Sequence, residues 1–438
     1  MNQPRRAQRF AVLPAYGIGQ SELRCCLESL RHLGLLEQLL LVCSHDDAGV
    51  VPPEVAVITD AFCSPRALAA KIERLCRTHD ARVTAVVGID EELHFSLSRR
   101  LALHCKVPFH SEQTCFVASN KLLCKQAFVR AGVPTSAFAL VSEPGGPAAR
   151  SVGFPNVLKT LSGTQSQYLF RNESRQALAS NLAKLREACG AAVGDPRFEP
   201  QSVVIDGTPM AWDPRRNFLL EAYVPGLEYS CDFLVDGSEV RIIRIAKKIP
   251  GPQLGIFAGY ALLDGAGLRS EGFSLDRLMA VCVRIAQAFQ VRQAVCMVDF
   301  KWTGDALMVL ESSVRPGFSA FNHLMYDLVG YTSLALMVAH ALGQPVALRR
   351  PVASGAVVYL IAPEGEGGDL DTTRLQAHAR ALGITAIHCF PNEGESTETD
   401  PARRLRGYAL VRDCPPERLG YHINAIQGLI DFREREMR

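Results

Sequence analysis

The segment 309–317, "VLESSVRPG", gathers side chains that could do chemistry at the end of an apolar, strand-like run. Glu311, Ser313 and Arg315 are spaced two apart, so on an extended chain they face the same side. A carboxylate and a guanidinium that point into one space suggest a cation and an anion as ligands, or a salt bridge between the two residues. For this segment taken alone, the salt bridge is the favoured interpretation.

A second carboxylate, Asp299, lies across the turn "WTGDA" from Glu311. Residues equidistant from a hairpin turn sit opposite each other, so the two carboxylates are expected close enough to share one ion. Two carboxylates that point inward together are costly unless a cation balances them. Arg315 could pair with Glu311, but Asp299 would then remain as an unbalanced acid. Oxygen ligands with open positions suit Mg²⁺ or Mn²⁺, which take a few carboxylates and complete their shell with phosphate.

Two widely separated lysines, Lys121 and Lys159, are each set in an apolar context. Lys121 taken singly is best interpreted as a solvated charge at a helix end, whereas the mid-strand position of Lys159 favours a function. A short polar loop follows Lys159, and its N–H groups could wrap a phosphate. Downstream, "EAYVPGLE" (221–228) would present backbone groups to a flat base and Glu228 to a ribose diol.

The elements that must position these residues follow from the hydrophobic pattern. Strand-like and helical runs alternate over roughly the first 110 residues, which predicts a doubly wound parallel sheet. A helix is expected at 64–79, because Ser64 can cap it and Pro65 suits its first turn. The later pattern predicts hairpins at 154–170 and 294–317, antiparallel strands at 217–249, a loop at 250–267, and helices at 274–290 and 331–342. The final region opens with a strand at 355–363 and closes with a helix at 422–437.

The order of these motifs resembles the ATP-grasp ligases, in particular the carboxylate–amine and L-amino-acid ligases. The resemblance runs from about Val83 to the C-terminus and rests on "NKLLCKQAFVRAGVP", the loop after Lys159, "EAYVPGLE", "VDFK" and "LESSVRPG" in sequence. It implies that ATP and Mg²⁺ (or Mn²⁺) are bound. The implied ATP-binding residues are Lys121, Lys159, Ser162, Gly163, Ser166, Glu221, Ala222, Tyr223, Val224 and Glu228. The implied metal ligands are Asp299, Glu311 and Ser313, and the implied catalytic residues are Arg315 and Lys159.

Three features depart from the family's usual pattern. Asn usually stands where this chain has Ser313, Glu usually stands where it has Asp299, and the phosphate loop is usually richer in glycine. A hydroxyl is a weaker metal ligand than an amide oxygen, so these departures affect the binding of a second metal ion most. They also keep open a hypothesis from another class, a degenerate nucleotide-binding or scaffold protein.

Composition excludes several classes of protein. The 438 residues carry 47 basic and 45 acidic side chains, so the net charge of +2 gives no reason to expect nucleic acid or an anionic membrane as a partner. No apolar stretch reaches the roughly 18 residues of a membrane span. The 14 cysteines form no CxxC motif, which favours reduced, buried thiols and a cytoplasmic protein without structural disulfides or zinc. His323, in "FSAFNHLMYD", is interpreted equally well as a core residue or as a substrate contact.

We therefore expect an ADP-forming ligase that activates a carboxylate as an acyl phosphate and joins it to an amine, with an amino acid as the expected substrate. The expected layout is an α/β domain (1–112), a first ATP-grasp lobe with the phosphate loop (113–205), a second lobe with the adenine hinge and metal site (206–348), and a small C-terminal α+β region (349–438). The expected partners are small-molecule substrates, and a homodimer is left open. The alternatives are the scaffold hypothesis and another ATP-grasp branch, carboxylase-like or purine-pathway.

Overall fold

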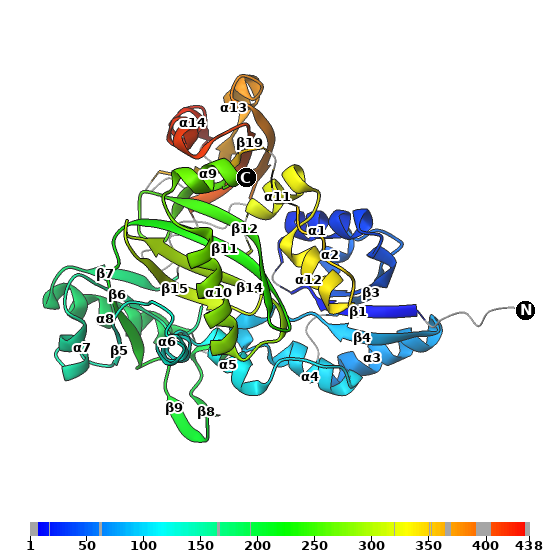
Figure 1. The fold of residues 1–438 in the computed structure, drawn as a ribbon, viewed down its shortest axis with the longest axis horizontal. Helices are drawn as coiled ribbons and strands as arrows, with labels where there is room; N and C mark the ends of the chain where they lie inside the picture. Colours follow the sequence, from blue (N-terminus) through cyan, green and yellow to red (C-terminus); the bar gives the residue numbers. More distant parts are fainter. Residues whose placement is uncertain are drawn as a thin grey trace, which may run out of the picture.

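The fold was analysed in a computed structural model of the chain, shown in Figure 1. The structure describes residues 8–16, 18–60, 64–163, 167–192, 194–318, 320–349, 351, 353–363, 369–390 and 404–433. Three bodies are visible. The N-terminal domain lies beside a large central sheet, and a smaller sheet with its own helices lies at the other end of the molecule (Figure 1).

The N-terminal domain is a four-stranded parallel sheet in the order β3-β2-β1-β4. Both faces of β1 are buried, and alternate residues serve different helices. Leu13 belongs to the cluster that contains α1, whereas Val12 packs with Leu68 of α3 and Leu101 of α4. Helices on both faces confirm the doubly wound prediction. The strands are Gln8–Pro14, Leu39–Cys43, Ala56–Thr59 and Ala81–Val86, and the helices α1 to α4 are Gln20–His32, His45–Ala48, Pro65–Thr78 and Ser96–Cys105.

Local sequence signals explain where several of these helices begin and end. The Ser64 hydroxyl accepts a hydrogen bond from the Ala67 N–H, with Pro65 in the first turn, as predicted. The segment 91–105, whose hydrophobic pattern is helical, is divided in the structure. Residues 91–93 form a short 3₁₀ turn, and His94 and Phe95 adopt positive φ before α4 starts at Ser96. This break holds Glu91 at the carboxyl end of β4.

A second, antiparallel sheet of order β5-β10-β6-β7 forms the smaller lobe. The predicted hairpin at 154–170 is confirmed as β6 and β7. Strand β10 lies within the range expected for the second lobe but pairs with β5 and β6, so the chain crosses between lobes after β10. The elements are α5 (Glu112–Ser119), α6 (Lys121–Arg130), β5 (Phe138–Val141), α7 (Pro147–Val152), β6 (Asn156–Lys159), β7 (Leu169–Asn172), α8 (Arg175–Ala191) and β10 (Phe218–Ala222). A separate hairpin, β8 (Gln201–Ile205) with β9 (Thr208–Trp212), projects from the body (Figure 1).

The central sheet has eight strands in the order β15-β14-β11-β12-β13-β16-β19-β18. Side chains alternate between its faces. Phe233 of β11 packs in the cluster with α10, and its neighbour Leu234 packs on the side of α11 and α12. The strands are Leu307–Ser313, Gln293–Trp302, Leu227–Asp236, Glu239–Pro250, Phe257–Leu262, Gly355–Ile361, Leu405–Arg412 and Ile384–Cys389, and the helices α9 to α12 are Gly265–Ser270, Leu275–Phe289, Phe321–Val329 and Ser333–Ala341.

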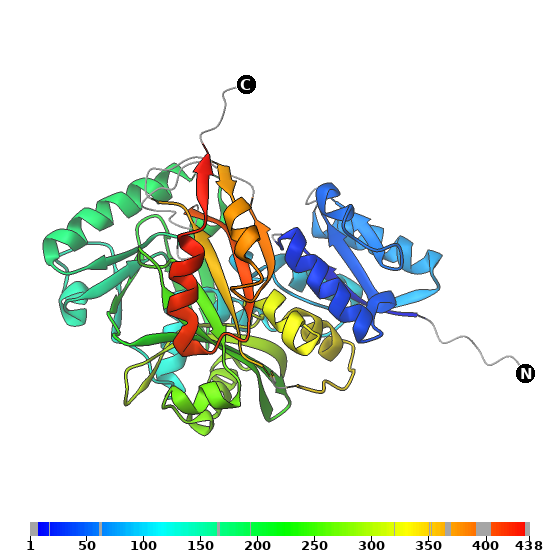
Figure 2. The same cartoon turned by 90° about the horizontal axis from the view of Figure 1, so that it is seen from above.

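Two expectations about this half of the chain were wrong. The segment 250–267, predicted as a loop because of its glycines, contains β13, whose Gly259 lies so close to the Val357 carbonyl that a side chain would not fit. The C-terminal helix does not continue to residue 437. Helix α14 (Leu419–Gln427) stops at Gly428 and is followed by β20 (Asp431–Arg433), which pairs with β17 (Asp369–Asp371) beside α13 (Thr373–His378). Helix α14 lies along the C-terminal strands (Figure 2).

The domains are joined by apolar contacts rather than by linkers alone. Helix α1 of the N-terminal domain packs against α11 and α12, and the three helices share one hydrophobic cluster. Among the residues that the structure describes, no single helix is long and apolar enough to cross a membrane. The pair α11 and α12 meets that test only together, with a bend of 74° between them.

Candidate active site

The two predicted metal carboxylates face each other across the β14–β15 hairpin. Asp299 and Glu311 are direct partners in the antiparallel register, which confirms their expected juxtaposition. The register shifts immediately afterwards, because Phe300 pairs with Val309 and leaves Leu310 as the extra residue of a bulge. One Asp299 oxygen lies 2.6 Å from Lys248 Nζ, and the other is buried with no hydrogen-bond partner among the described residues.

Three lysines, Lys121, Lys159 and Lys248, act electrostatically on Glu311. Lys121 Nζ is 3.9 Å from its carboxylate, and the side chain keeps 40% of its exposure. Burial would raise the pKa of Glu311, but Lys121, Lys159 and Lys248 together lower it. Glu311 is therefore held as a charged and accessible acceptor.

The donor set can be tested against the cation that the sequence implied. Within the described part of the chain, no group of three or more His, Cys, Asp or Glu side chains converges as a metal site. Two opposed carboxylates, one with an unpartnered buried oxygen, fit a hard cation that takes its other ligands from phosphate or water. The Ser313 hydroxyl is buried and lies against the Glu91 carboxylate. Its role as a metal ligand stays a prediction.

Lys159 belongs to a buried triad that the sequence did not reveal. Its Nζ lies 2.6 Å from one oxygen of Glu221, and Lys125 Nζ lies 2.8 Å from the other. Burial alone would raise the pKa of Glu221, but the two lysines lower it to about 2. Two ammonium groups thus share one carboxylate, so the triad carries an excess positive charge that an anion would complement.

Lys125 was missed at the level of sequence, because its spacing from Lys121 was the only sequence feature that linked it to the site. Lys125 lies four positions after Lys121 on α6, but the hydrophobic pattern gave no reason to bury it. Its ammonium group also donates to Thr135 Oγ1 at 2.6 Å and to the Val309 carbonyl at 3.2 Å. Lys125 therefore ties α6 to β15 as well as to Glu221.

The predicted phosphate loop lies next to Lys121. The Lys121 N–H donates to the Leu161 carbonyl at 2.8 Å, and Nζ donates to the Gly163 carbonyl at 2.6 Å. Gly163 has φ +120°, a conformation that side chains disfavour. The Ser162 hydroxyl is buried and has no hydrogen-bond partner among the described residues. Ser166 lies outside the residues that the structure describes.

The predicted adenine hinge is only partly free to bind a base. The Glu221 side chain belongs to the lysine triad, and the N–H groups of Ala222 and Tyr223 donate to the carbonyls of Ala137 and Pro155. For Val224, no described backbone carbonyl accepts the N–H, and its own carbonyl accepts from Lys301 Nζ at 2.9 Å. Of the four hinge residues, Val224 thus retains an N–H for a ligand.

Glu228, predicted to meet a ribose, is joined to the metal carboxylates through Lys248. The Lys248 ammonium lies 3.0 Å from Glu228 and 2.6 Å from Asp299. Burial would lower the pKa of Lys248, but Asp299 and Glu228 raise it above its ordinary value. The adjacent Lys247 is also paired, with Glu271 at 2.7 Å.

Arg315 contacts a residue from the N-terminal domain. Its Nη2 lies 2.5 Å from the Glu91 carboxylate, and its Nη1 donates to the Pro316 carbonyl at 2.9 Å. Burial raises the pKa of Glu91, and Arg315, Ser313 and Lys121 oppose that rise. Glu311, Ser313 and Arg315 therefore do face one space, and Glu91 lies within it. The available sequence signal was the acidic pair "EE" at the carboxyl end of β4, where ligands of parallel sheets bind.

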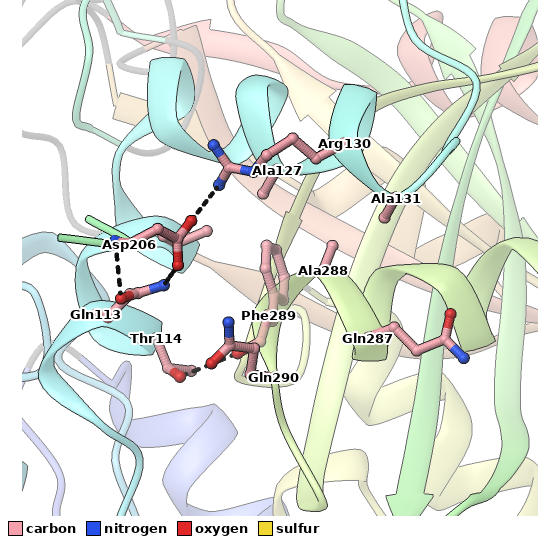
Figure 3. Close-up of a pocket in the computed structure, with 11 residues that line it drawn as sticks. Gln113, Thr114, Ala127, Arg130, Ala131, Asp206, Gln287, Ala288, Phe289 and Gln290 are labelled. Carbon is pink, nitrogen blue, oxygen red and sulfur yellow. Dashed lines mark hydrogen bonds and ion pairs between the residues drawn. The ribbon is translucent and has the colours of Figure 1, made fainter. Parts of the chain in front are cut away.

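A separate pocket of about 260 Å³ lies between α5, α6 and the end of α10, away from these residues (Figure 3). Asp206 closes one side. It accepts a hydrogen bond from Gln113 at 2.7 Å and lies 3.6 Å from Arg130. None of its lining residues belongs to the lysine and carboxylate cluster, so we exclude it from the candidate active site.

The arrangement of the whole chain matches known structures. The L-amino acid ligase from Bacillus licheniformis aligns with a TM-score of 0.73 and 15% identity over 99% of this chain and 100% of its own. This chain has the ATP-grasp fold. The same ATP-grasp fold relates it to N5-carboxyaminoimidazole synthase from Aspergillus clavatus in complex with ADP and 5-aminoimidazole ribonucleotide, with a TM-score of 0.66, 15% identity, and coverage of 97% of this chain and 99% of that one.

A biotin carboxylase–β,γ-ATP complex from Campylobacter jejuni aligns with a TM-score of 0.62 and 16% identity over 98% of this chain and 92% of its own. At such identities the likeness concerns the fold. No protein-family model matches the sequence, and no curated protein sequence matches it. In this ATP-grasp fold the candidate residues lie where the two lobes meet, with Lys159 and Glu221 on the small sheet and Asp299 and Glu311 on the large one.

Proposed function

We propose that this protein is an ATP-dependent, ADP-forming ligase that joins a carboxylate, activated as an acyl phosphate, to an amine, with an amino acid as the expected substrate. The observation that carries the proposal is the set of lysines that act on Glu311, together with the excess positive charge of the Glu221 triad. These charges converge where the two lobes of the ATP-grasp fold meet. The whole-chain similarity to an L-amino acid ligase supports the choice of substrate class.

In this proposal the two lysines divide the phosphates of ATP between them. Lys159 neutralises the charge of the terminal phosphates, and its contact with Glu221 fixes its direction. The ammonium group of Lys121 donates to the Gly163 carbonyl, so this lysine and the phosphate loop would contact the phosphates together. Val224 offers its N–H to the adenine edge, and Glu228 accepts the ribose hydroxyls.

Asp299 and Glu311 would hold the magnesium ion, with the third position at Ser313 taken by its hydroxyl. When bound, the ion neutralises charge on the phosphates of ATP and holds them in place. The protein residues orient the groups around it. Lys248 fixes Asp299 from the side of β12, and the hairpin register fixes the separation of the two carboxylates.

The proposed reaction has two balanced steps. A substrate carboxylate oxygen attacks the terminal phosphorus of ATP, the bond to the bridging oxygen breaks, and ADP leaves. The neutral amine then attacks the acyl carbon and the bond from that carbon to the phosphate oxygen breaks. Phosphate leaves with the bonding pair and takes one proton from the nitrogen. Arg315 would hold the transferred phosphoryl group, since its guanidinium pairs with Glu91, whose carboxylate is also influenced by Ser313 and Glu311.

The test is ADP release by the pure protein with ATP, Mg²⁺ and a pool of the twenty L-amino acids. Parallel arms replace the pool by simple carboxylates or by bicarbonate, and Glu311→Gln is the inactive control. Release that requires amino acids and gives a new amide supports the proposal. Release that requires only bicarbonate would assign the protein to the carboxylase-like branch. Tight ATP binding without release in any arm would favour the nucleotide-binding scaffold.

A further inference from the structure

Glu22 lies beside the proposed reaction centre although it belongs to the N-terminal domain. It stands in the first turn of α1, which packs against α11. The guanidinium of Arg315 and the phenol of Tyr408 on β19 are both within electrostatic reach of its carboxylate. Tyr408 hydrogen-bonds the His323 ring of α11 at 3.0 Å, and Ser21, which precedes Glu22, lies close enough to influence both side chains. Glu22 is therefore held at the junction of the N-terminal domain, the end of β15 and the C-terminal strands.

The Glu22 carboxylate is enclosed by protein but not paired. Among the described residues it has no hydrogen bond or ion pair, although the side chain keeps partial solvent access. Burial raises its pKa to about 7, and Arg315 acts in the opposite direction. On its own helix, Cys25 is the ionisable group that feels its charge. Glu91, by contrast, is already paired with Arg315 at 2.5 Å.

An unpaired carboxylate next to the proposed acyl-phosphate site has a chemical use. An amine attacks an acyl carbon only as the free base, yet most aliphatic amines carry a proton at neutral pH. A carboxylate attracts such an ammonium group and takes its proton most effectively when its own affinity for protons matches the working pH. His323, the neighbouring imidazole, is a poorer acceptor because burial lowers its pKa to about 4.

We propose that Glu22 is the residue that binds the ammonium group of the acceptor substrate and removes one proton before the amine attacks the acyl phosphate. The proposal rests on the ligase function proposed above. In the step, the N–H bond breaks and its electron pair stays on nitrogen, while the proton forms a new O–H bond on Glu22. The nitrogen pair then forms the C–N bond as the bond from the acyl carbon to the phosphate oxygen breaks, and the departing phosphate takes the second proton from the nitrogen.

An acid in a helix's first turn also has a purely structural interpretation, because the helix dipole favours negative charge there. The two interpretations differ in which half-reaction depends on Glu22. Formation of the acyl phosphate needs no proton acceptor for an amine. Hydroxylamine, which is largely unprotonated at neutral pH, intercepts acyl phosphates as hydroxamates without that acceptor.

The experiment compares Glu22→Gln with wild type in two assays that use ATP, Mg²⁺ and the pool of twenty L-amino acids. One adds hydroxylamine and measures hydroxamate as its coloured ferric complex, and the other omits it and measures amide products by mass spectrometry. We expect hydroxamate to stay near the wild-type level while amide formation falls by about 10²- to 10⁴-fold at pH 7. The deficit should shrink as the pH approaches the pKa of the acceptor amine, and Glu22→Asp should recover part of the rate.

Glu28→Gln is the matched control, because Glu28 lies on the same helix and pairs at the surface with Arg31. It should leave both assays unchanged. Wild-type amide formation by Glu22→Gln would overturn the proposal, and so would an equal loss in both assays by a variant that still binds ATP in calorimetry. If the wild-type protein forms neither hydroxamate nor amide, the proposed ligase function fails and this inference falls with it.

Discussion

Replacing Lys159 by Met should weaken ATP binding without destabilising the fold. In the buried triad, Lys159 and Lys125 share Glu221. Removal of Lys159 leaves one ammonium and one carboxylate, so the remaining pair is neutral and no buried charge lacks a partner. The variant therefore keeps its fold but loses the excess positive charge that we assign to the phosphates of ATP.

The size of the effect follows from the interaction that is removed. A hydrogen bond to a charged group contributes about 1.5–3 kcal/mol. Because about 1.4 kcal/mol corresponds to tenfold in affinity, the dissociation constant for ATP should rise by about 10- to 150-fold. The free energy of unfolding should change by less than about 1 kcal/mol, since the Met side chain fills the space of the lysine stem.

Lys125→Met is the matched variant, with the opposite expected outcome. Its ammonium group also donates to Thr135 and to the Val309 carbonyl, so its loss leaves buried polar atoms short of a partner. The expected cost is about 1–3 kcal/mol of stability. The triad also loses its excess charge, but Lys159 remains to contact the phosphates, so ATP affinity should fall less than in Lys159→Met. Calorimetric titration with ATP and denaturant unfolding of both variants measure the two quantities. Unchanged ATP affinity in Lys159→Met would refute the assignment of Lys159 to the phosphates.

Further predictions concern the same site and the wider molecule. Glu311→Gln should abolish ADP release, with poor rescue by excess Mg²⁺, because the ion loses one of two carboxylates; full rescue would contradict this role. Arg315→Lys should bind ATP but turn over at least about 10²-fold more slowly in a steady-state ADP assay. The 13 described cysteines are free, so native mass spectrometry should find no disulfide and no zinc. Finally, the Glu22 carboxyl has a folded-state pKa of about 7 against an ordinary 4.5, so its stabilising effect is complete below about pH 4.5 and is lost as the pH rises through 7. Glu22→Gln should therefore be more stable than wild type by up to about 3 kcal/mol at pH 8, and equally stable at pH 4, in denaturant titrations.

The sequence predicted local geometry better than contacts between distant elements. The hairpin that brings Asp299 near Glu311 was predictable from the "TGD" turn, but their direct opposition was not. The register set by the turn would place Leu310 opposite Asp299, and the bulge at Leu310 puts Glu311 there instead. The Glu221 triad was not, because it joins residues from β6, β10 and α6 whose approach depends on how helix and sheet pack. The contact of Glu91 with Arg315 was hidden for the same reason, since it crosses from the first domain to the end of β15.

The missed strand β13 has a different physical cause. Glycine lowers strand propensity, and the segment 250–267 is rich in it. Tertiary context overrides that preference here, because Gly259 is required where the strand passes close to the Val357 carbonyl. The end of the last helix was missed because Gly428 was treated as interior to the pattern, although glycine commonly stops a helix.

The strand order of the central sheet affects how the chain is made in a cell. Strand β13 lies between β12 and β16, and β16 in turn lies between β13 and β19. During synthesis β13 therefore presents an unpaired edge until residues 355–361 have left the ribosome, and β16 does so until residues 405–412 follow. Exposed strand edges recruit other chains. The nascent protein thus carries an aggregation-prone edge until nearly its whole length has been translated, which makes it a natural client for chaperones that act late in synthesis.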